Sequence, residues 1–175
     1  EKAIEIVQKY PNAALVTGPI CKKSWALAGH NYSGQTELLA ESCQAKNVGM
    51  LFTAKSPITG WRFNTLLATT HIPLCEVPKQ LSKSLIHSKL DLFSKFCKNY
   101  VEEPILKVAG LNPHAGEEGL LGSEEKDWIK NAVTCWGNKN KGVQVSGPIS
   151  PDTCWNSSST AWRDKTAPTH DGILA

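Results

Sequence analysis

Two of the five histidines follow apolar segments that are typical of buried strands. His71 lies in LLATTHIPL, after the expected strand Phe63–Thr69, and His114 lies in KVAGLNPHAG, after the expected strand Ile105–Ala109. Ligands of open α/β sheets bind at the carboxyl ends of strands, so two imidazoles placed there could share one divalent metal ion. The two histidines form no local motif, so a structural role for each stays open.

The other three histidines lack this context. His30 and His87 have no supporting neighbours, and His170 precedes an apolar run instead of following one. We therefore expect none of the three to be a metal ligand.

A glycine-rich stretch surrounds His114. The stretch includes Asn112, Pro113, Gly116, Gly119 and Gly122. Glycine allows a positive φ and a close approach of backbone to ligand, which favours a functional loop over an ordinary surface loop.

Polar turns beside apolar segments form a second group of candidates. They are Thr17-Gly18-Pro19, with Lys22 close by, and Gly34 followed by Gln35 and Thr36. Backbone N–H groups at a helix start could bind an anion such as phosphate, although a plain helix cap explains the second turn equally well. The sequence contains neither G-x-G-x-x-G nor a P-loop lysine motif, so a Rossmann or Walker nucleotide site is not indicated.

Short apolar runs alternate with amphipathic stretches, which is typical of an α/β fold. The expected helices are Glu1–Tyr10, Gln35–Gln44, Pro78–Tyr100 and Glu124–Val133. The expected strands are Ala13–Val16, Val48–Thr53 and Phe63–Thr69 (a hairpin), Ile105–Ala109, Val143–Val145 and a final apolar run Gly172–Ala175. We expect Asn156–Pro168 to be a loop with one helical turn.

Composition excludes several classes of protein. The 175 residues are 41% hydrophobic and 20% charged, and no apolar run is long enough for a membrane span. The net charge of +3 is scattered, which gives a nucleic-acid role little support. Six widely spaced cysteines without C-x-x-C, and no secretory signal, favour mostly buried thiols in a reducing cytoplasm. The chain does not begin with Met, and we expect it to start inside a longer protein.

Several stretches together resemble one family. AALVTGPICK, AGHNYSGQTELLAE, LLATTHIPL, KVAGLNPHAGEEGLLGSEE and VSGPISPDTCW occur in the order found in 4-hydroxythreonine-4-phosphate dehydrogenases. The resemblance implies a three-layer α/β/α fold with a mixed sheet, as part of a two-lobed subunit. It also implies a homodimer with its active site near the interface, NAD as cofactor, and a divalent metal (Zn, Mg or Co). Residues 1–175 would be a partial domain that lacks the family's N-terminal and C-terminal portions.

The same resemblance assigns roles to individual residues. His71 and His114 match two of the family's three metal-binding histidines, and the third is expected in a Y-H-D-Q-G motif beyond Ala175. Thr36 matches a substrate-binding Thr, and Gln35 replaces the His that precedes it. This replacement removes any acid–base role there but leaves hydrogen bonding.

Two further positions carry over from the family. Asp152 matches a motif Asp near the substrate, or else is a helix cap. Lys22 matches the Lys of TGPxxK, whose role is less defined.

The implied reaction is NAD-dependent oxidation of 4-phosphooxy-L-threonine to 2-amino-3-oxo-4-phosphooxybutanoate. That product decarboxylates to 3-amino-2-oxopropyl phosphate during pyridoxal phosphate synthesis. Two alternatives stay open: a paralogue that oxidises threonate or erythronate 4-phosphate, and a truncated fragment without activity.

Overall fold

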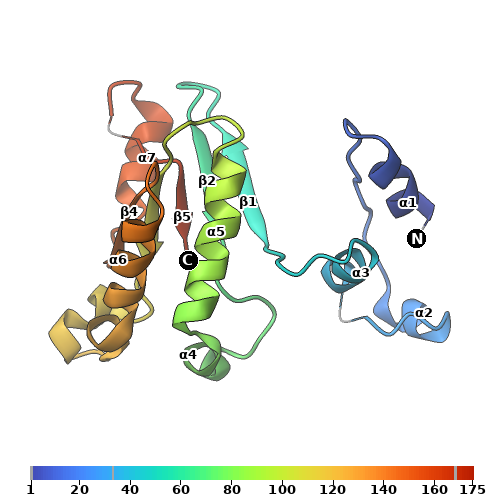
Figure 1. Cartoon of the computed structure of the whole chain (residues 1–175), viewed down its shortest axis with the longest axis horizontal. Coiled ribbons are helices and arrows are strands. Elements are labelled where there is room, and N and C mark those ends of the chain that lie inside the picture. The colour runs from blue at the N-terminus through green and yellow to red at the C-terminus, as the bar shows by residue number, and fades with distance from the viewer. Residues whose placement is uncertain (1, 33, 168) are drawn as a thin grey trace. The chain divides into compact units, whose positions relative to one another are not determined.

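The computed structural model describes residues 2–32, 34–167 and 169–175. The chain divides into two compact units, residues 1–48 and residues 49–175 (Figure 1). None of the helices in the described part of the chain is long and apolar enough to cross a membrane.

The first unit is helical. Its helices are α1 (Lys2–Lys9), α2 (Lys22–Leu27) and α3 (Gln35–Ser42). Thus α1 and α3 confirm two expected helices, whereas α2 was not expected. The predicted strand Ala13–Val16 is wrong. The described residues of this unit contain no other strand to pair with it, and the run stays an extended connection in which Val16 is 92% exposed.

The second unit is built on a mixed five-stranded sheet with the order β1-β2-β5-β3-β4. Its strands are β1 (Leu51–Lys55), β2 (Arg62–Leu66), β3 (Ile105–Ala109), β4 (Gln144–Ile149) and β5 (Gly172–Leu174). β1 pairs antiparallel with β2, which confirms the hairpin, and the remaining pairs are parallel. The predicted bounds of β3 match the observed ones, while β4 extends further toward the carboxyl end than expected.

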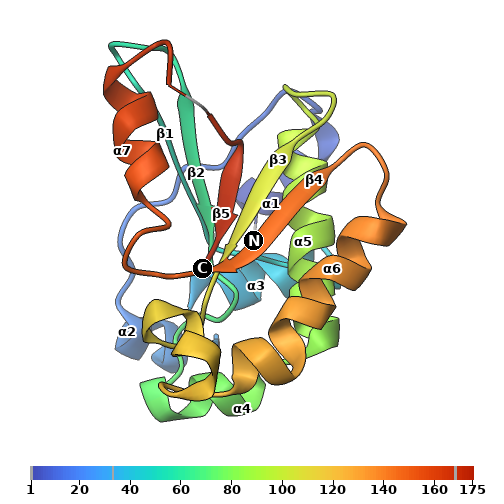
Figure 2. The ribbon, with the colours of Figure 1, turned by 90° about the vertical axis from the view of Figure 1, so that its left-hand side faces the viewer.

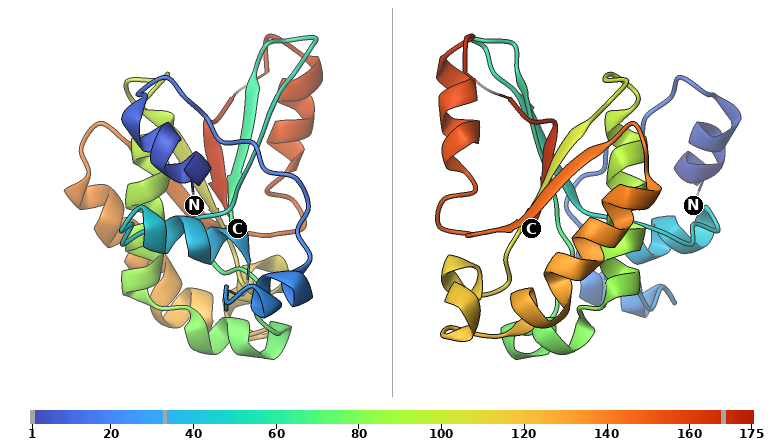
Figure 3. Two further views of the ribbon diagram at one scale, coloured as in Figure 1. Left: turned by 90° about the vertical axis from the view of Figure 1, so that its right-hand side faces the viewer. Right: turned by 60° about the vertical axis from the view of Figure 1, so that its left-hand side comes forward.

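Helices cover both faces of this sheet, which confirms the α/β/α layers (Figures 2 and 3). α5 (Lys83–Cys97) and α6 (Lys130–Lys139) lie on one face, and α7 (Asn156–Arg163) lies on the other. The sequence predicts an apolar stripe in the region of α5, because Ile86, Leu90, Phe93, Cys97 and Tyr100 recur at intervals of four and three. The first four lie in the core between the sheet and α5, whereas Tyr100 is 40% exposed. Burial of this stripe is the main reason that α5 stays on the sheet.

The predicted helix Pro78–Tyr100 is two helices instead of one. α4 (Val77–Gln80) follows a short 3-10 turn (Leu74–Glu76), and α5 begins after Ser82. The Ser82 hydroxyl accepts a hydrogen bond from the Leu85 amide at 3.2 Å, so Ser82 is the N-cap of the new helix. A serine cap therefore sets a helix start that the apolar periodicity does not reveal.

Two further expectations need correction. The predicted helix Glu124–Val133 begins as a π-helical turn (Glu125–Ile129) and continues as α6 to Lys139. The segment Asn156–Pro168, expected to be mostly loop, contains the eight-residue helix α7, and residue 168 lies outside the described residues.

The cysteines also differ from expectation. All six are free, but Cys21, Cys43 and Cys75 are exposed, and only Cys97 and Cys154 are buried. The prediction that most are buried is therefore wrong.

The four parallel strands end at one edge of the sheet, where β2, β5, β3 and β4 converge (Figure 2). Backbone hydrogen bonds extend the pairing there: the Ala175 amide donates to Leu66 O, and the Ala68 amide donates to Ala175 O. The segments that carry His71, His114 and Asp152 follow β2, β3 and β4 at this edge.

Candidate active site

His71 and His114 leave the sheet from the two strands that flank β5. Both side chains are exposed, and both residues have a positive φ, 56° for His71 and 53° for His114. His71 makes no hydrogen bond or ion pair within the described residues. Its imidazole therefore has both nitrogens available to a ligand.

His114 and Asp152 are brought into contact. The His114 amide donates to Asp152 Oδ2 at 3.1 Å, and the His114 Nε2 lies 3.9 Å from the same oxygen. The Ser150 hydroxyl also donates to this oxygen, at 2.9 Å. The Ser150 hydroxyl first, and then the His114 amide, lower the pKa of Asp152, so the residue is an anion at neutral pH. Asp152 was predicted to bind substrate, and that role stays a prediction. In the structure its carboxylate accepts a hydrogen bond from the His114 amide.

The backbone around His114 forms a left-handed turn. His114 to Glu118 all have positive φ, between 44° and 80°. Only one of the five is glycine, and each of the other four costs roughly 1 kcal/mol in this conformation. Such strain persists only where the surrounding structure holds it.

Asn112 and Glu125 supply part of that surrounding structure. The Asn112 amide donates to Glu125 Oε1 at 2.7 Å, and Asn112 Nδ2 donates to Glu125 Oε2 at 2.9 Å and to Glu124 Oε2 at 2.7 Å. Glu125 is only 4% exposed. A carboxylate at this depth needs hydrogen-bond donors, and Asn112 provides them.

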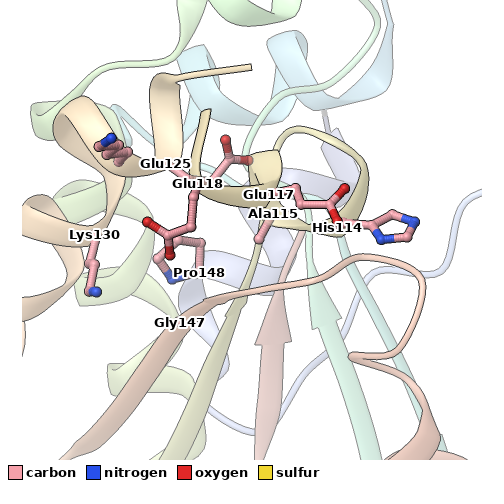
Figure 4. Close-up of a pocket in the computed structure, with 9 residues that line it drawn as sticks. His114, Ala115, Glu117, Glu118, Glu125, Lys130, Gly147 and Pro148 are labelled. Atoms are coloured by element: carbon pink, nitrogen blue, oxygen red, sulfur yellow. The ribbon is translucent and has the colours of Figure 1, made fainter. Parts of the chain in front are cut away.

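A pocket of about 390 Å³ lies beside this turn (Figure 4). Its charged lining residues are Glu117, Glu118, Glu125, Lys126 and Lys130, together with His114. Figure 4 shows the Glu118 carboxylate on the side of Lys130 and Pro148, and the His114 ring on the other side of the turn. The pocket can therefore contact both negatively and positively charged groups of a ligand.

A second cavity, about 240 Å³, lies at the same edge of the sheet. It is lined by the ends of β2, β3 and β5 and by α4, with Thr69, Leu74, Leu81 and Leu111 among its residues. No charged side chain lines it, so it suits an apolar part of a ligand.

Gln35, Thr36 and Lys22 belong to the first unit. Both polar atoms of the Gln35 side chain are engaged: Oε1 accepts from the Thr17 hydroxyl at 2.5 Å, and Nε2 donates to Gly18 O at 2.9 Å. Gln35 therefore holds the Thr17-Gly18-Pro19 turn against the start of α3. Thr36 lies in the first turn of α3, after Gly34 at the N-cap, and Lys22 is the exposed first residue of α2.

The second unit offers imidazoles and carboxylates as donors for a metal ion, with His71, His114 and Asp152 among them. Imidazole nitrogen suits Zn, and carboxylate oxygen suits Zn or Mg. Within the described residues, no group of three or more His, Cys, Asp or Glu is arranged to hold an ion. The imidazole and carboxylate donors are therefore of the right chemical type for a divalent metal ion, but they would be only part of its ligand set.

Sequence reasoning missed the roles of Asn112 and Glu125. Glu125 falls in the first turn of the expected helix Glu124–Val133, where acidic residues are common because they suit the helix dipole. The glycines and the Asn-Pro pair within residues 110–122 indicated an unusual loop. Nothing in that stretch indicated that Asn112 would pair with a carboxylate thirteen residues later in the chain.

Comparison with known proteins agrees with this architecture. The family model described as pyridoxal phosphate biosynthetic protein PdxA matches residues 1–175. The 4-hydroxythreonine-4-phosphate dehydrogenase of Synechococcus sp. (strain RCC307) is 50% identical over 93% of the chain, and that of Synechocystis sp. (strain ATCC 27184 / PCC 6803 / Kazusa) is 48% identical over 85%.

Solved structures agree as well. The crystal structure of 4-hydroxythreonine-4-phosphate dehydrogenase from Klebsiella pneumoniae superposes with a TM-score of 0.83 at 31% identity, over 99% of this chain and 48% of that one. This chain spans about half the length of the Synechococcus relative, 50%, and 43% of the Synechocystis one. On this match over its whole length, the chain belongs to the PdxA family of pyridoxal phosphate biosynthetic proteins.

Proposed function

We propose that this chain supplies part of the active site of an NAD-dependent 4-hydroxythreonine-4-phosphate dehydrogenase. The reaction is oxidation of the secondary alcohol of 4-phosphooxy-L-threonine to a β-keto acid, which then loses CO2. The proposal is supported mainly by the sheet order. β5 lies between β2 and β3, and the segments after β2 and β3 carry His71 and His114.

In this proposal His71 and His114 hold a divalent cation, Zn, Mg or Co, through imidazole nitrogens. The proposal includes the third histidine that the family resemblance places after β5. A residue that followed β5 would leave the sheet between the strands that carry the other two. When bound, the cation would lower the pKa of the substrate hydroxyl, and NAD would accept the hydride.

The chain's own residues position these groups. Asp152 accepts a hydrogen bond from the His114 amide, and its Oδ2 lies 3.9 Å from His114 Nε2, so it holds the His114 segment and places a carboxylate beside the imidazole. Thr36, through its hydroxyl and the backbone N–H groups at the start of α3, would bind a substrate phosphate or hydroxyl oxygen; the N-cap Gly34 has no side chain to cap them. Lys22 could add a positive charge for the same phosphate.

Gln35 bears only indirectly on which of the three candidate substrates the protein oxidises. Its carboxamide is engaged by Thr17 and Gly18 and does not titrate, so it supports a binding surface without proton transfer. Turnover with 4-phosphooxy-L-threonine, compared with threonate and erythronate 4-phosphates, would distinguish the parent enzyme from the paralogue. The homodimer and the cytoplasmic location remain predictions, to be tested by sedimentation and by fractionation.

A chimera tests the proposal directly. In the Synechococcus relative, the half that this chain matches is replaced by residues 1–175, and NADH formation is measured with substrate and Zn²⁺. We expect activity with the unmodified chain, and loss of activity with His71→Ala or His114→Ala. His30→Ala serves as the control because His30 lies outside the proposed site.

A chimera that folds, as judged by circular dichroism and size-exclusion chromatography, but forms no NADH with any of the three substrates would contradict the proposal. Activity that survives both His71→Ala and His114→Ala would contradict the assignment of these residues as metal ligands.

A further inference from the structure

Glu125 is an acidic residue buried beside the turn that carries His114. It is 4% exposed, and no ion pair within the described residues includes it. Both carboxylate oxygens instead receive N–H groups of a single residue, Asn112: Oε1 from the backbone amide at 2.7 Å and Oε2 from Nδ2 at 2.9 Å. This two-point attachment fixes the backbone and the side chain of Asn112 together.

Asn112 is the point from which the left-handed turn starts. It precedes Pro113, and its carbonyl accepts a hydrogen bond from the Ala115 amide at 3.0 Å. The position of Asn112 therefore determines where His114, two residues later, directs its own amide toward Asp152.

The turn also packs closely around the Glu125 carboxylate. A Cβ at Gly116 would lie 2.8 Å from Glu125 Oε2, and a Cβ at Gly110 would lie 3.2 Å from Glu125 Oε1. Two glycines thus allow the backbone to close over the carboxylate. An apolar side chain of similar size could fill this space but would accept neither N–H of Asn112.

We propose that Glu125 is the positioning residue of His114. Its carboxylate anchors Asn112, Asn112 sets the left-handed turn, and the turn holds His114 against Asp152. The functional meaning of this role depends on His114 being a metal ligand, as proposed above, whereas the structural role can be measured separately.

The test uses Glu125→Gln, which keeps the size of the side chain but replaces one acceptor oxygen with an NH2 group. Asp127→Asn is the matched control, because Asp127 lies on the same helical turn and, within the described residues, its carboxylate accepts a hydrogen bond only from the Ser123 hydroxyl. Amide hydrogen exchange is followed by NMR at His114 and at Leu106 and Val108 in β3. Zn²⁺ titrations are followed at the imidazole resonances.

We expect Glu125→Gln to speed exchange at the His114 amide roughly tenfold, the effect of about one lost hydrogen bond, with β3 unchanged. Asp127→Asn should leave all three amides unchanged. Unchanged protection at His114 in Glu125→Gln, or an equal loss of protection throughout β3, would overturn the proposal. If Glu125→Gln does not fold, Asn112→Ala provides the second variant, since it removes only the Nδ2 contacts and should give the same local effect.

The Zn²⁺ titration separates this inference from the proposed function. If the His114 ring of the unmodified chain does not respond to Zn²⁺, the metal site is wrong, while the exchange comparison still decides whether Glu125 positions His114. If the ring responds, Glu125→Gln should weaken the response at His114 more than at His71.

Discussion

Gly116→Ala should destabilise the second unit more than a glycine-to-alanine change at a positive-φ turn position where a new Cβ would meet open space. Gly116 has a φ of 80°, which costs a non-glycine residue about 1 kcal/mol. In addition, the new Cβ would lie 2.5 Å from Gly122 O and 2.8 Å from Glu125 Oε2. Backbone cannot move aside as a flexible side chain can, so overpacking adds about 1–3 kcal/mol. The expected total is about 2–4 kcal/mol.

Gly142→Ala provides a matched control. Gly142 has nearly the same φ, 81°, and a Cβ there would have no atom within 4 Å. It should therefore lose only the conformational part, about 1 kcal/mol. Urea unfolding followed by tryptophan fluorescence gives both free energies of unfolding. Equal destabilisation by the two substitutions would refute the packing of the turn around Glu125.

Three further predictions concern the fold and the activity. Burial, and secondarily the charge of Lys107, lower the pKa of His170 to about 4. The neutral ring therefore contributes stability above pH 6.5 that is lost as the pH falls toward 4, up to roughly 3 kcal/mol. Urea unfolding between pH 7 and 4 should show this slope in the natural chain and not in His170→Asn, and equal slopes would contradict it. Asp91→Ala should cost about 1–3 kcal/mol in thermal or urea unfolding, because Trp136 Nε1 donates to Asp91 Oδ1 at 2.7 Å and would lose its acceptor; no change would show that water replaces it. The isolated 175-residue chain should form no NADH with substrate and Zn²⁺, since two imidazoles hold a cation weakly; measurable turnover would show that residues 1–175 suffice.

The spacing of apolar residues predicted those helices and strands whose position depends on the sequence of a single segment. The apolar run at Ile105–Ala109 gave a central strand, and the spacing of Ile86, Leu90, Phe93 and Cys97 gave the buried face of α5. The spacing did not reveal the break before α5, because a cap depends on one hydroxyl and not on a period. The run Ala13–Val16 looked like a strand, but a strand also needs a hydrogen-bonded neighbour.

The sequence indicated which residue types could form the candidate site but not the contacts between them. His71 and His114 stood out because they follow apolar strands, and their role as metal ligands stays a prediction. The contact of His114 with Asp152 depends on the pairing of β3 with β4, which residue order alone does not give. The role of Glu125 depends on a left-handed turn made largely of residues that rarely adopt it. No propensity predicts such a turn, because tertiary packing and not local preference holds it.

The central claim, that His71 and His114 bind one divalent cation, is tested most directly by a double-mutant cycle. Co²⁺ affinity is measured by calorimetry for the unmodified chain, His71→Ala, His114→Ala and the double variant. If both rings bind the same ion, each single change should weaken binding nearly as much as the double change, with a coupling of about 1–3 kcal/mol. Strictly additive effects, or an affinity that either single change leaves intact, would contradict the shared site.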